Sequence, residues 1–209
     1  MLEARQLACL KGDRLLFRDV SAQIAAGELW RVAGANGAGK TSLLRILCGL
    51  AQPEHGEVLF RGESIRRARE PFHQSLLYIG HAPALHALLT PLETLRFACA
   101  SAGQQLDEEA ALAALARVGL AAQAQLPNHV LSQGQRRRVG LSRLFVSAQR
   151  PLWVLDEPFT ALDVHAVADM ASTLDAHCAA GGAVIMTTHQ DAPFARAPQV
   201  LELKGGDAW

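Results

Sequence analysis

The stretch Gly34-Ala35-Asn36-Gly37-Ala38-Gly39-Lys40-Thr41 decides the fold of this chain. It matches the pattern G-x-x-x-x-G-K-[ST] of a phosphate-binding loop. A short apolar run that predicts a strand, residues 29–33, precedes it, and an apolar helix is predicted over residues 41–50. Because glycines let backbone N–H groups turn toward a phosphate, and the helix points the positive end of its dipole at it, the stretch predicts a strand, a phosphate-binding loop and a helix in succession.

The residues of this loop have separate tasks on a nucleoside triphosphate. Lys40 is expected to reach the β and γ oxygens, and the Thr41 hydroxyl is expected to bind Mg²⁺. A glycine-rich turn without a ligand is the alternative, but it suits isolated glycines better than a full match between a strand and a helix. The predicted nucleotide-binding residues are Gly34, Ala35, Asn36, Gly37, Ala38, Gly39, Lys40, Thr41 and Ser42.

Two adjacent carboxylates follow a second apolar run. Residues 152–155 predict a buried strand, and Asp156 and Glu157 stand directly after it. Ligands of α/β proteins bind at the carboxyl ends of the strands. We therefore expect Asp156 to hold Mg²⁺ through its water shell and Glu157 to orient and deprotonate the attacking water. An acidic turn that caps the strand is the alternative interpretation.

Strands and helices alternate along most of the chain. Strands are predicted over residues 15–24, 57–60 and 183–186, and a helix is predicted over residues 164–180. A second β-α-β unit therefore includes the two carboxylates. This order predicts an α/β fold with a mainly parallel, buried sheet.

The middle of the chain is rich in alanine and leucine at helical spacing, from residue 91 to residue 120. We expect a helical insert over about residues 83–147. The acidic cluster Asp107-Glu108-Glu109 suits the negatively charged start of one helix in it. A solvated helix face explains the same cluster equally well.

The composition favours one globular domain, residues 1–209, since half of the residues are hydrophobic. The chain has 20 basic residues, counting lysine and arginine, and 20 acidic residues, so its formal net charge is zero. Because a neutral chain has no long-range positive field to attract nucleic acid, we expect no nucleic-acid partner. We see no secretory signal and no run of ~20 apolar residues, so we expect any transport pathway to come from another chain. The four cysteines are scattered, as expected of small apolar core residues in a reducing compartment.

Three further motifs resemble those of a known family, the ATP-binding-cassette (ABC) ATPases. Leu131-Ser132-Gln133-Gly134-Gln135 is similar to the L-S-G-G-Q signature of that family, with Gln133 in place of one glycine. Ala161-Leu162-Asp163 resembles its D-loop, and Thr188-His189 resembles its switch histidine. The motifs follow one another in the family's order, and the resemblance covers nearly the whole chain.

The resemblance implies an ABC nucleotide-binding domain, a P-loop NTPase of the α/β class with a mainly parallel core sheet, an antiparallel β subdomain and a helical insert. It implies ATP and Mg²⁺ as cofactors, and a head-to-tail homodimer in which the signature of one subunit closes over the γ-phosphate held by the other. The implied catalytic residues are Lys40, Glu157 and His189, the implied metal ligands are Thr41 and Asp156, and the further implied nucleotide contacts are Ser132, Gly134, Gln135 and Asp163.

Two positions depart from the family's pattern. Ala82 stands where the family usually has a glutamine that helps to hold Mg²⁺ and water. This departure is expected to alter turnover or the coupling to a membrane subunit. The neighbouring His81 is either a partial substitute for the glutamine or a bystander. Lys11 stands about where an aromatic side chain usually stacks on adenine, and Phe17 is the nearby aromatic candidate. The run Arg136-Arg137-Arg138 is interpreted as a solvated helix face or a contact with a partner.

Within the family, residues 77–81, 156–164 and 187–190 are most similar to the ATP-binding subunits of the bacterial cytochrome c maturation system. That resemblance implies membrane-spanning partners of the B and C type, and a haem chaperone that ATP hydrolysis releases in its haem-loaded form. It also implies a peripheral place on the cytoplasmic face of the inner membrane. One alternative is the ATP-binding subunit of an ABC transporter for another solute. Another is a soluble ABC ATPase acting on ribosomes or DNA, which the single cassette and the neutral charge disfavour.

Overall fold

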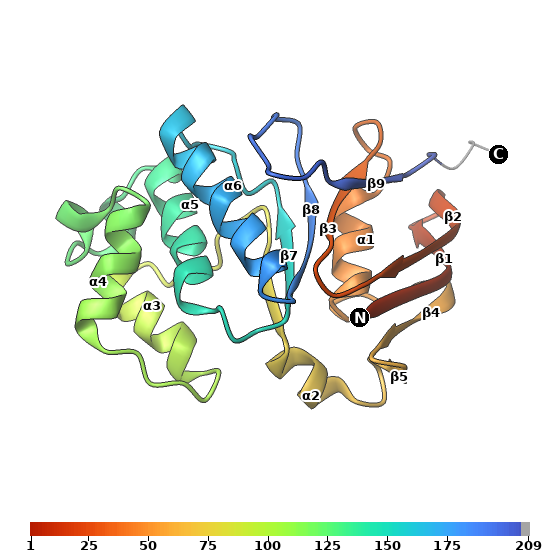
Figure 1. Ribbon diagram of the computed structural model, residues 1–209, viewed down its shortest axis with the longest axis horizontal. Helices are drawn as coiled ribbons and strands as arrows, with labels where there is room; N and C mark the ends of the chain where they lie inside the picture. Colours follow the sequence, from red (N-terminus) through yellow and green to blue (C-terminus); the bar gives the residue numbers. More distant parts are fainter. Residues whose placement is uncertain (206–209) are drawn as a thin grey trace.

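Two β-sheets of different kinds form the frame of the structure, a computed structural model that describes residues 1–205 (Figure 1). The four-stranded sheet is antiparallel, with the order β2-β1-β4-β5, and the five-stranded sheet is parallel, with the order β6-β7-β8-β3-β9. The antiparallel strands are β1 (Leu2–Lys11), β2 (Arg14–Ile24), β4 (His55–Phe60) and β5 (Glu63–Ser64), and the parallel strands are β3 (Leu29–Ala33), β6 (Leu76–Ile79), β7 (Leu152–Asp156), β8 (Ala183–Thr187) and β9 (Gln199–Glu202). The α/β class, the parallel core sheet and the separate antiparallel sheet are thereby confirmed.

Helix α1 (Lys40–Leu47) lies between the two sheets (Figure 1). Its apolar side chains share one core with residues of both sheets, such as Phe17 of β2 and Val154 of β7. Burying a leucine or isoleucine side chain is worth about 1.5–3 kcal/mol, so the helix is a principal link between the sheets. The buried side chains of α1 are Leu43, Leu44, Ile46 and Leu47.

The strands of the parallel sheet divide their side chains between two cores. Leu152 and Val154 of β7 pack on the α1 side, whereas Trp153 and Leu155 pack in a second core with α6 (Val164–Ala179). Because side chains alternate along a strand, the next residue, Asp156, falls on the α1 side. The period of two therefore turns this carboxylate, the last residue of β7, toward the face that α1 covers.

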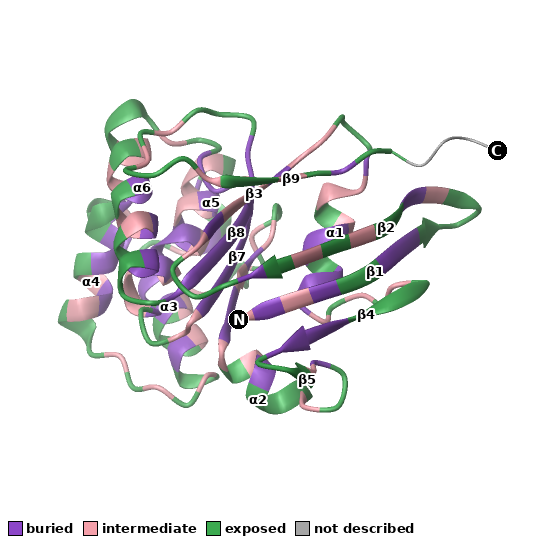
Figure 2. Cartoon of the chain, turned by 45° about the vertical axis from the view of Figure 1, so that its right-hand side comes forward, coloured by how far each residue is buried: buried purple, intermediate pink, exposed green. Residues whose placement is uncertain are grey.

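The segment between β6 and β7 is helical. It contains α3 (Pro91–Ala100), α4 (Glu108–Arg117) and α5 (Gln133–Leu141), and the short helices η1 (Ala121–Gln123), η2 (Asn128–Val130) and η3 (Ser142–Val146). Most of their buried apolar residues belong to the second core, on the face of the parallel sheet opposite α1 (Figure 2). We propose that residues 83–147 form an inserted helical subdomain. In residues 1–205, no helix combines the length and the apolar character needed to cross a membrane.

The alanine-rich stretch that begins at residue 91 contains two helices with a break between them. The Thr90 hydroxyl accepts from the backbone N–H of Glu93, and Glu93 accepts in return from Thr90, so a capping box starts α3. The Asp107 carboxylate accepts from the N–H of Ala110 at 2.7 Å and caps α4. The acidic cluster therefore starts a helix, as predicted, and Gly103, with φ +74°, lies in the break.

Helix α1 ends three residues before the predicted limit at residue 50, at Leu47. Gly49 takes φ +68°, its N–H donates to Ile46, and the N–H of Leu50 donates to Arg45. These two bonds form a Schellman motif, which needs a residue in the left-handed region. The glycine thus ends the helix, as expected, but the last helical residue precedes it by two positions.

Three elements were not predicted: β1, β5 and the short helix α2 (Arg69–Gln74). In β1 the register shifts between Ala4 and Leu7, and again on either side of Cys9, where β1 pairs with β2. These irregularities place Leu7, Ala8 and Cys9 in the interior one after another, so the sequence of β1 has no clean alternation to detect.

All four cysteines lie in the described part of the chain, and all are buried and free. Burial raises the pKa of each of these thiols, that of Cys178 to about 11. A thiol with a raised pKa is a poor nucleophile. The expectation that these cysteines are small core residues is confirmed.

A buried histidine packs between α6 and the parallel sheet. The His177 ring stacks on Trp153 with the ring centroids 3.8 Å apart and an angle of 9° between the planes. Burial lowers the pKa of His177 from its ordinary value, and a backbone hydrogen bond with Pro151 offsets part of that effect. The neutral form of this histidine is thus the form that the fold accommodates.

Acidification should therefore destabilise the protein through His177. Because the unfolded chain binds the proton more readily than the folded one, the free energy of unfolding is expected to fall as the pH drops below about 6.5, the ordinary histidine pKa. Urea unfolding at pH 8, 7, 6 and 5 measures this. His177→Gln should be less stable at pH 8 but should lose less stability between pH 7 and pH 5. His165→Gln, which removes an exposed histidine from the same helix, is the control; equal pH dependence in all three proteins would contradict the prediction.

Candidate functional site

The phosphate-binding loop leads directly into the first turn of α1. Gly39 is the N-cap residue, with φ +96° and no side chain to accept hydrogen bonds from the first-turn N–H groups. By contrast, side chains of Thr90, Asp107 and Ser132 cap α3, α4 and α5. The first N–H groups of α1 are therefore available to an anion, with the positive end of the helix dipole behind them.

The shape of the loop depends on glycine at two positions. A Cβ on Gly34 would lie 2.7 Å from the carbonyl oxygen of Leu203, and a Cβ on Gly39 would lie 3.0 Å from Leu16 and Phe17. The Lys40 ammonium donates to the carbonyls of Gly34 at 2.7 Å and Ala35 at 3.3 Å. The loop thus curls around the lysine that the sequence assigns to the phosphates.

A buried carboxylate joins α1 to two parallel strands. Asp156, at the end of β7, is 2% exposed. Its Oδ2 accepts from the Thr41 hydroxyl at 2.9 Å, and its Oδ1 accepts from the Thr187 hydroxyl at 2.6 Å. The two predicted metal ligands, Thr41 and Asp156, are therefore in direct contact, 115 positions apart in the chain.

The next residue, Glu157, has an unusual backbone. Its φ is +54°, in a region of backbone conformation that residues other than glycine rarely occupy. Its N–H donates to the Thr187 hydroxyl at 3.0 Å and lies 3.2 Å from the Thr187 carbonyl oxygen. The Glu157 carboxylate lies 3.7 Å from Nε2 of His189, whose side chain is 59% exposed. These two predicted catalytic residues are thus neighbours, at a distance too long for a direct hydrogen bond.

The reading of Arg136-Arg137-Arg138 as a solvated face or a partner contact is wrong for Arg137, which is 6% exposed. Its guanidinium donates to the carbonyls of Gly80, His81, Asp156 and Glu157. Arg138 donates to the Val118 carbonyl at 3.0 Å. Residues far apart in the sequence supply these carbonyls, so the arginine run alone gave no sign of them.

The hollow beside the loop, of about 350 Å³, is lined by Lys11, Arg14 and Leu16 together with residues of the loop and of α1. Phe17 is fully buried beneath Gly39 and does not face this hollow. The nearby aromatic candidate is therefore unavailable to the adenine base, and the two cationic side chains that flank the turn between β1 and β2 line the hollow instead.

The signature motif lies away from the loop. Ser132 caps α5, where its hydroxyl accepts from the N–H of Gln135 at 3.2 Å. Helix α5 contributes to the second core, on the face of the parallel sheet opposite α1 (Figure 1). The ideal Cβ position of Gly134 lies 3.5 Å from Cβ of Ala161, so the signature and the D-loop-like stretch are adjacent. Asp163 caps α6 by accepting from Ala166.

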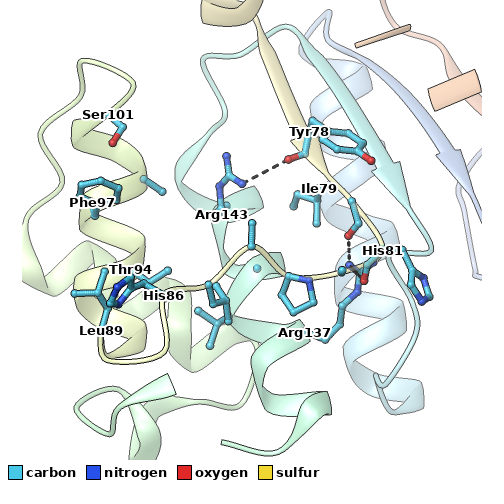
Figure 3. Close-up of a pocket in the computed structure, with 18 of the residues that line it drawn as sticks. Tyr78, Ile79, His81, His86, Leu89, Thr94, Phe97, Ser101, Arg137 and Arg143 are labelled. Atoms are coloured by element: carbon cyan, nitrogen blue, oxygen red, sulfur yellow. Dashed lines mark hydrogen bonds between the residues drawn. The ribbon is translucent and has the colours of Figure 1, made fainter. Parts of the chain in front are cut away.

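A groove of about 1080 Å³ runs from Thr41 and Arg45 past the loop after β6 to α3 (Figure 3). Ala82, at the position usually held by glutamine, and His81 are both exposed in this loop. Phe97 of α3 stands on the far wall and is 66% exposed. The groove therefore connects one side of α1 with the helical segment.

Two residues of the site were not predicted, Thr187 and Arg137. Thr187 ends β8 in direct register with Asp156, on the same face as Ile185. The alternation of the predicted strand at residues 183–186 was a usable signal for it. Arg137 gave no comparable signal, because its partners are backbone atoms of distant loops.

Comparisons with known proteins agree with this geometry. The family model described as ABC transporter matches residues 17–160. A cytochrome c biogenesis ATP-binding export protein, CcmA, of Aromatoleum aromaticum is 68% identical over 97% of this chain and 95% of its own. A CcmA of Salmonella paratyphi A is 50% identical over 100% of this chain and 99% of its own. A solved ATP-binding subunit of an ABC transporter superposes with a TM-score of 0.77 at 26% identity, over 90% of this chain and 79% of that one. The chain thus belongs to the ABC transporter family, as one of its ATPase subunits.

Proposed function

We propose that this chain binds and hydrolyses MgATP as the ATP-binding subunit of a membrane complex for cytochrome c maturation. The contact of Asp156 with Thr41, beside a helix N-terminus left open to phosphate, carries the ATPase part of the proposal. The 68% identity to a cytochrome c biogenesis ATP-binding export protein supports the part of the proposal that assigns this chain to cytochrome c maturation.

The residues of the site divide the work on ATP. The first-turn N–H groups of α1 and the Lys40 ammonium bind the β- and γ-phosphates. Thr41 and Asp156 suit Mg²⁺, because a hydroxyl and a carboxylate 2.9 Å apart form an all-oxygen pair. When bound, Mg²⁺ neutralises charge that develops on the phosphates. Further predicted contacts come from Ser42 and from the backbone of the loop.

Glu157 is the proposed general base, and it orients and deprotonates the attacking water. His189 is proposed to hydrogen-bond the γ-phosphate, since its exposed ring is free to turn toward a bound nucleotide. The Thr187 hydroxyl holds the backbone of Glu157 and the carboxylate of Asp156 together. The proposed base, Glu157, and the proposed metal ligand, Asp156, are thereby held at a fixed position relative to each other.

A head-to-tail homodimer would complete the site. Within one subunit the signature residues Ser132, Gly134 and Gln135 belong to α5, across the sheet from α1. A second copy would present its signature and its Asp163 to the nucleotide bound by the first. We propose peripheral attachment to the cytoplasmic face of the inner membrane, through membrane-spanning subunits of the B and C type, with release of a haem-loaded chaperone. Transport of another solute is the second candidate.

Replacing the general base should separate binding from hydrolysis. Glu157→Gln is expected to bind MgATP normally and to hydrolyse it roughly 10²–10⁴ times more slowly, because the amide cannot accept the proton. Lys40→Ala is expected to lose nucleotide binding or turnover. Equilibrium binding of labelled ATP and phosphate release measure the two properties; wild-type turnover by Glu157→Gln would rule out its role as base.

Arg14 should contribute to nucleotide affinity in place of an aromatic residue. A guanidinium over a base face is worth about 0.5–1 kcal/mol at an exposed site, or roughly a two- to fivefold change in affinity. Arg14→Ala is therefore expected to raise the Kd for MgATP by this factor and to leave kcat unchanged. Arg18→Ala removes an exposed arginine of the same strand outside the hollow and is the control. An unchanged Kd in Arg14→Ala would exclude the contact.

The process can be tested in the native bacterium. Replacing the chain by its Glu157→Gln form should abolish holocytochromes c, detected by haem staining, if ATP hydrolysis serves their maturation. Expression and membrane association of the variant are checked by immunoblot of cell fractions. Normal cytochrome content with a normally expressed variant would favour transport of another solute.

A further inference from the structure

Arg137 is a buried charged residue to which the proposed mechanism gives no task. Its guanidinium donates to the carbonyls of Gly80 and His81 after β6, and to those of Asp156 and Glu157 at the end of β7. The bonds to His81 and Glu157 are both 2.9 Å long. Figure 3 shows the guanidinium beside the loop that carries His81. One side chain therefore joins two loops at the carboxyl edge of the sheet.

The bond to Glu157 acts on the residue with the unusual backbone. A φ of +54° persists at a glutamate only where the surroundings hold it. Thr187 holds the N–H of this residue, and Arg137 holds its carbonyl. The two contacts fix the peptide groups on both sides of the Glu157 Cα, and thereby the direction in which the carboxylate leaves the backbone.

The other two bonds reach the groove. Gly80 and His81 line it, as does Arg137 itself. Arg137 also belongs to α5, the helix that Ser132 of the signature caps. The guanidinium thus connects three parts with different tasks: the signature helix, the loop beside the groove and the backbone of the proposed base.

We infer that Arg137 is a positioning residue for ATP hydrolysis, which orients Glu157 through its backbone and ties that orientation to the loop after β6. The inference rests on the proposed role of Glu157 as general base. All four acceptors are carbonyl oxygens, and only a planar fork with several donors reaches them together. Lysine carries the same charge but concentrates its donors at one point.

Arg137→Lys tests the inference, in the chain purified with the membrane proteins that accompany it. We expect kcat for ATP to fall by about tenfold or more, because a small displacement of a reacting group is costly. The KM and the Kd for MgATP should change by less than about threefold, since no hydrogen bond of Arg137 reaches the phosphate-binding loop. Arg137→Gln is the second variant, and the melting temperature of each is measured beside its kinetics.

Arg138→Lys is the matched control. Arg138 is the next residue of α5 and also donates to a carbonyl, that of Val118, away from the ends of β6 and β7. This variant should keep kcat within about twofold of wild type. A similar loss of kcat in both lysine variants, in step with their melting temperatures, would assign Arg137 a structural role only.

A double variant isolates the route of the effect. If Arg137 acts through Glu157, then adding Arg137→Lys to Glu157→Gln should lower kcat no further, since the group that it positions is already absent. Multiplied losses, or a wild-type kcat in folded Arg137→Lys, would overturn the inference. Wild-type turnover by Glu157→Gln alone would instead contradict the proposed base, so the two failures are distinguishable.

Discussion

The contact of Asp156 with two threonine hydroxyls is the interaction on which the site depends. A carboxylate that is 2% exposed must have its charge satisfied, and Thr41 and Thr187 do so from α1 and β8. The same bonds bring the phosphate-binding loop, the proposed metal ligand Asp156 and the end of β8, two residues before His189, to one edge of the parallel sheet. The alternation along β7 aims the carboxylate there, since Leu152 and Val154 anchor the same face in the core.

Around this contact, the site is built largely from backbone groups in unusual conformations. Gly39 leaves the N-terminus of α1 without a side-chain cap, while Glu157 occupies a left-handed conformation despite its side chain. In the proposed mechanism each conformation serves ATP hydrolysis, the first by leaving N–H groups open to an anion and the second by aiming a carboxylate. The conformation of Glu157 is held by two hydrogen bonds: its N–H donates to the Thr187 hydroxyl, and its carbonyl accepts from Arg137.

The two cores divide the tasks of the fold. One core surrounds α1 and supports the nucleotide side, and the other supports α5, α6 and the helices next to the groove. Because the signature belongs to the second core, a subunit on its own presents a signature that cannot cover its own phosphate-binding loop. The guanidinium of Arg137 crosses between these regions at the carboxyl edge of the sheet. One side chain thus connects the proposed ATP-binding site with the groove.

The sequence by itself determined the local elements: the phosphate-binding loop, strand β3, the acidic start of α4 and the apolar strand before Asp156. Each is encoded within a few adjacent residues, through glycine spacing, capping side chains and alternation. Only the tertiary structure decided that Arg137 is buried, that Phe17 lies beneath the loop and that Thr187 bonds Asp156. The reason is physical: these contacts join residues that lie far apart in the chain, up to 57 positions for Arg137 and Gly80, and a backbone carbonyl has no identity in the sequence.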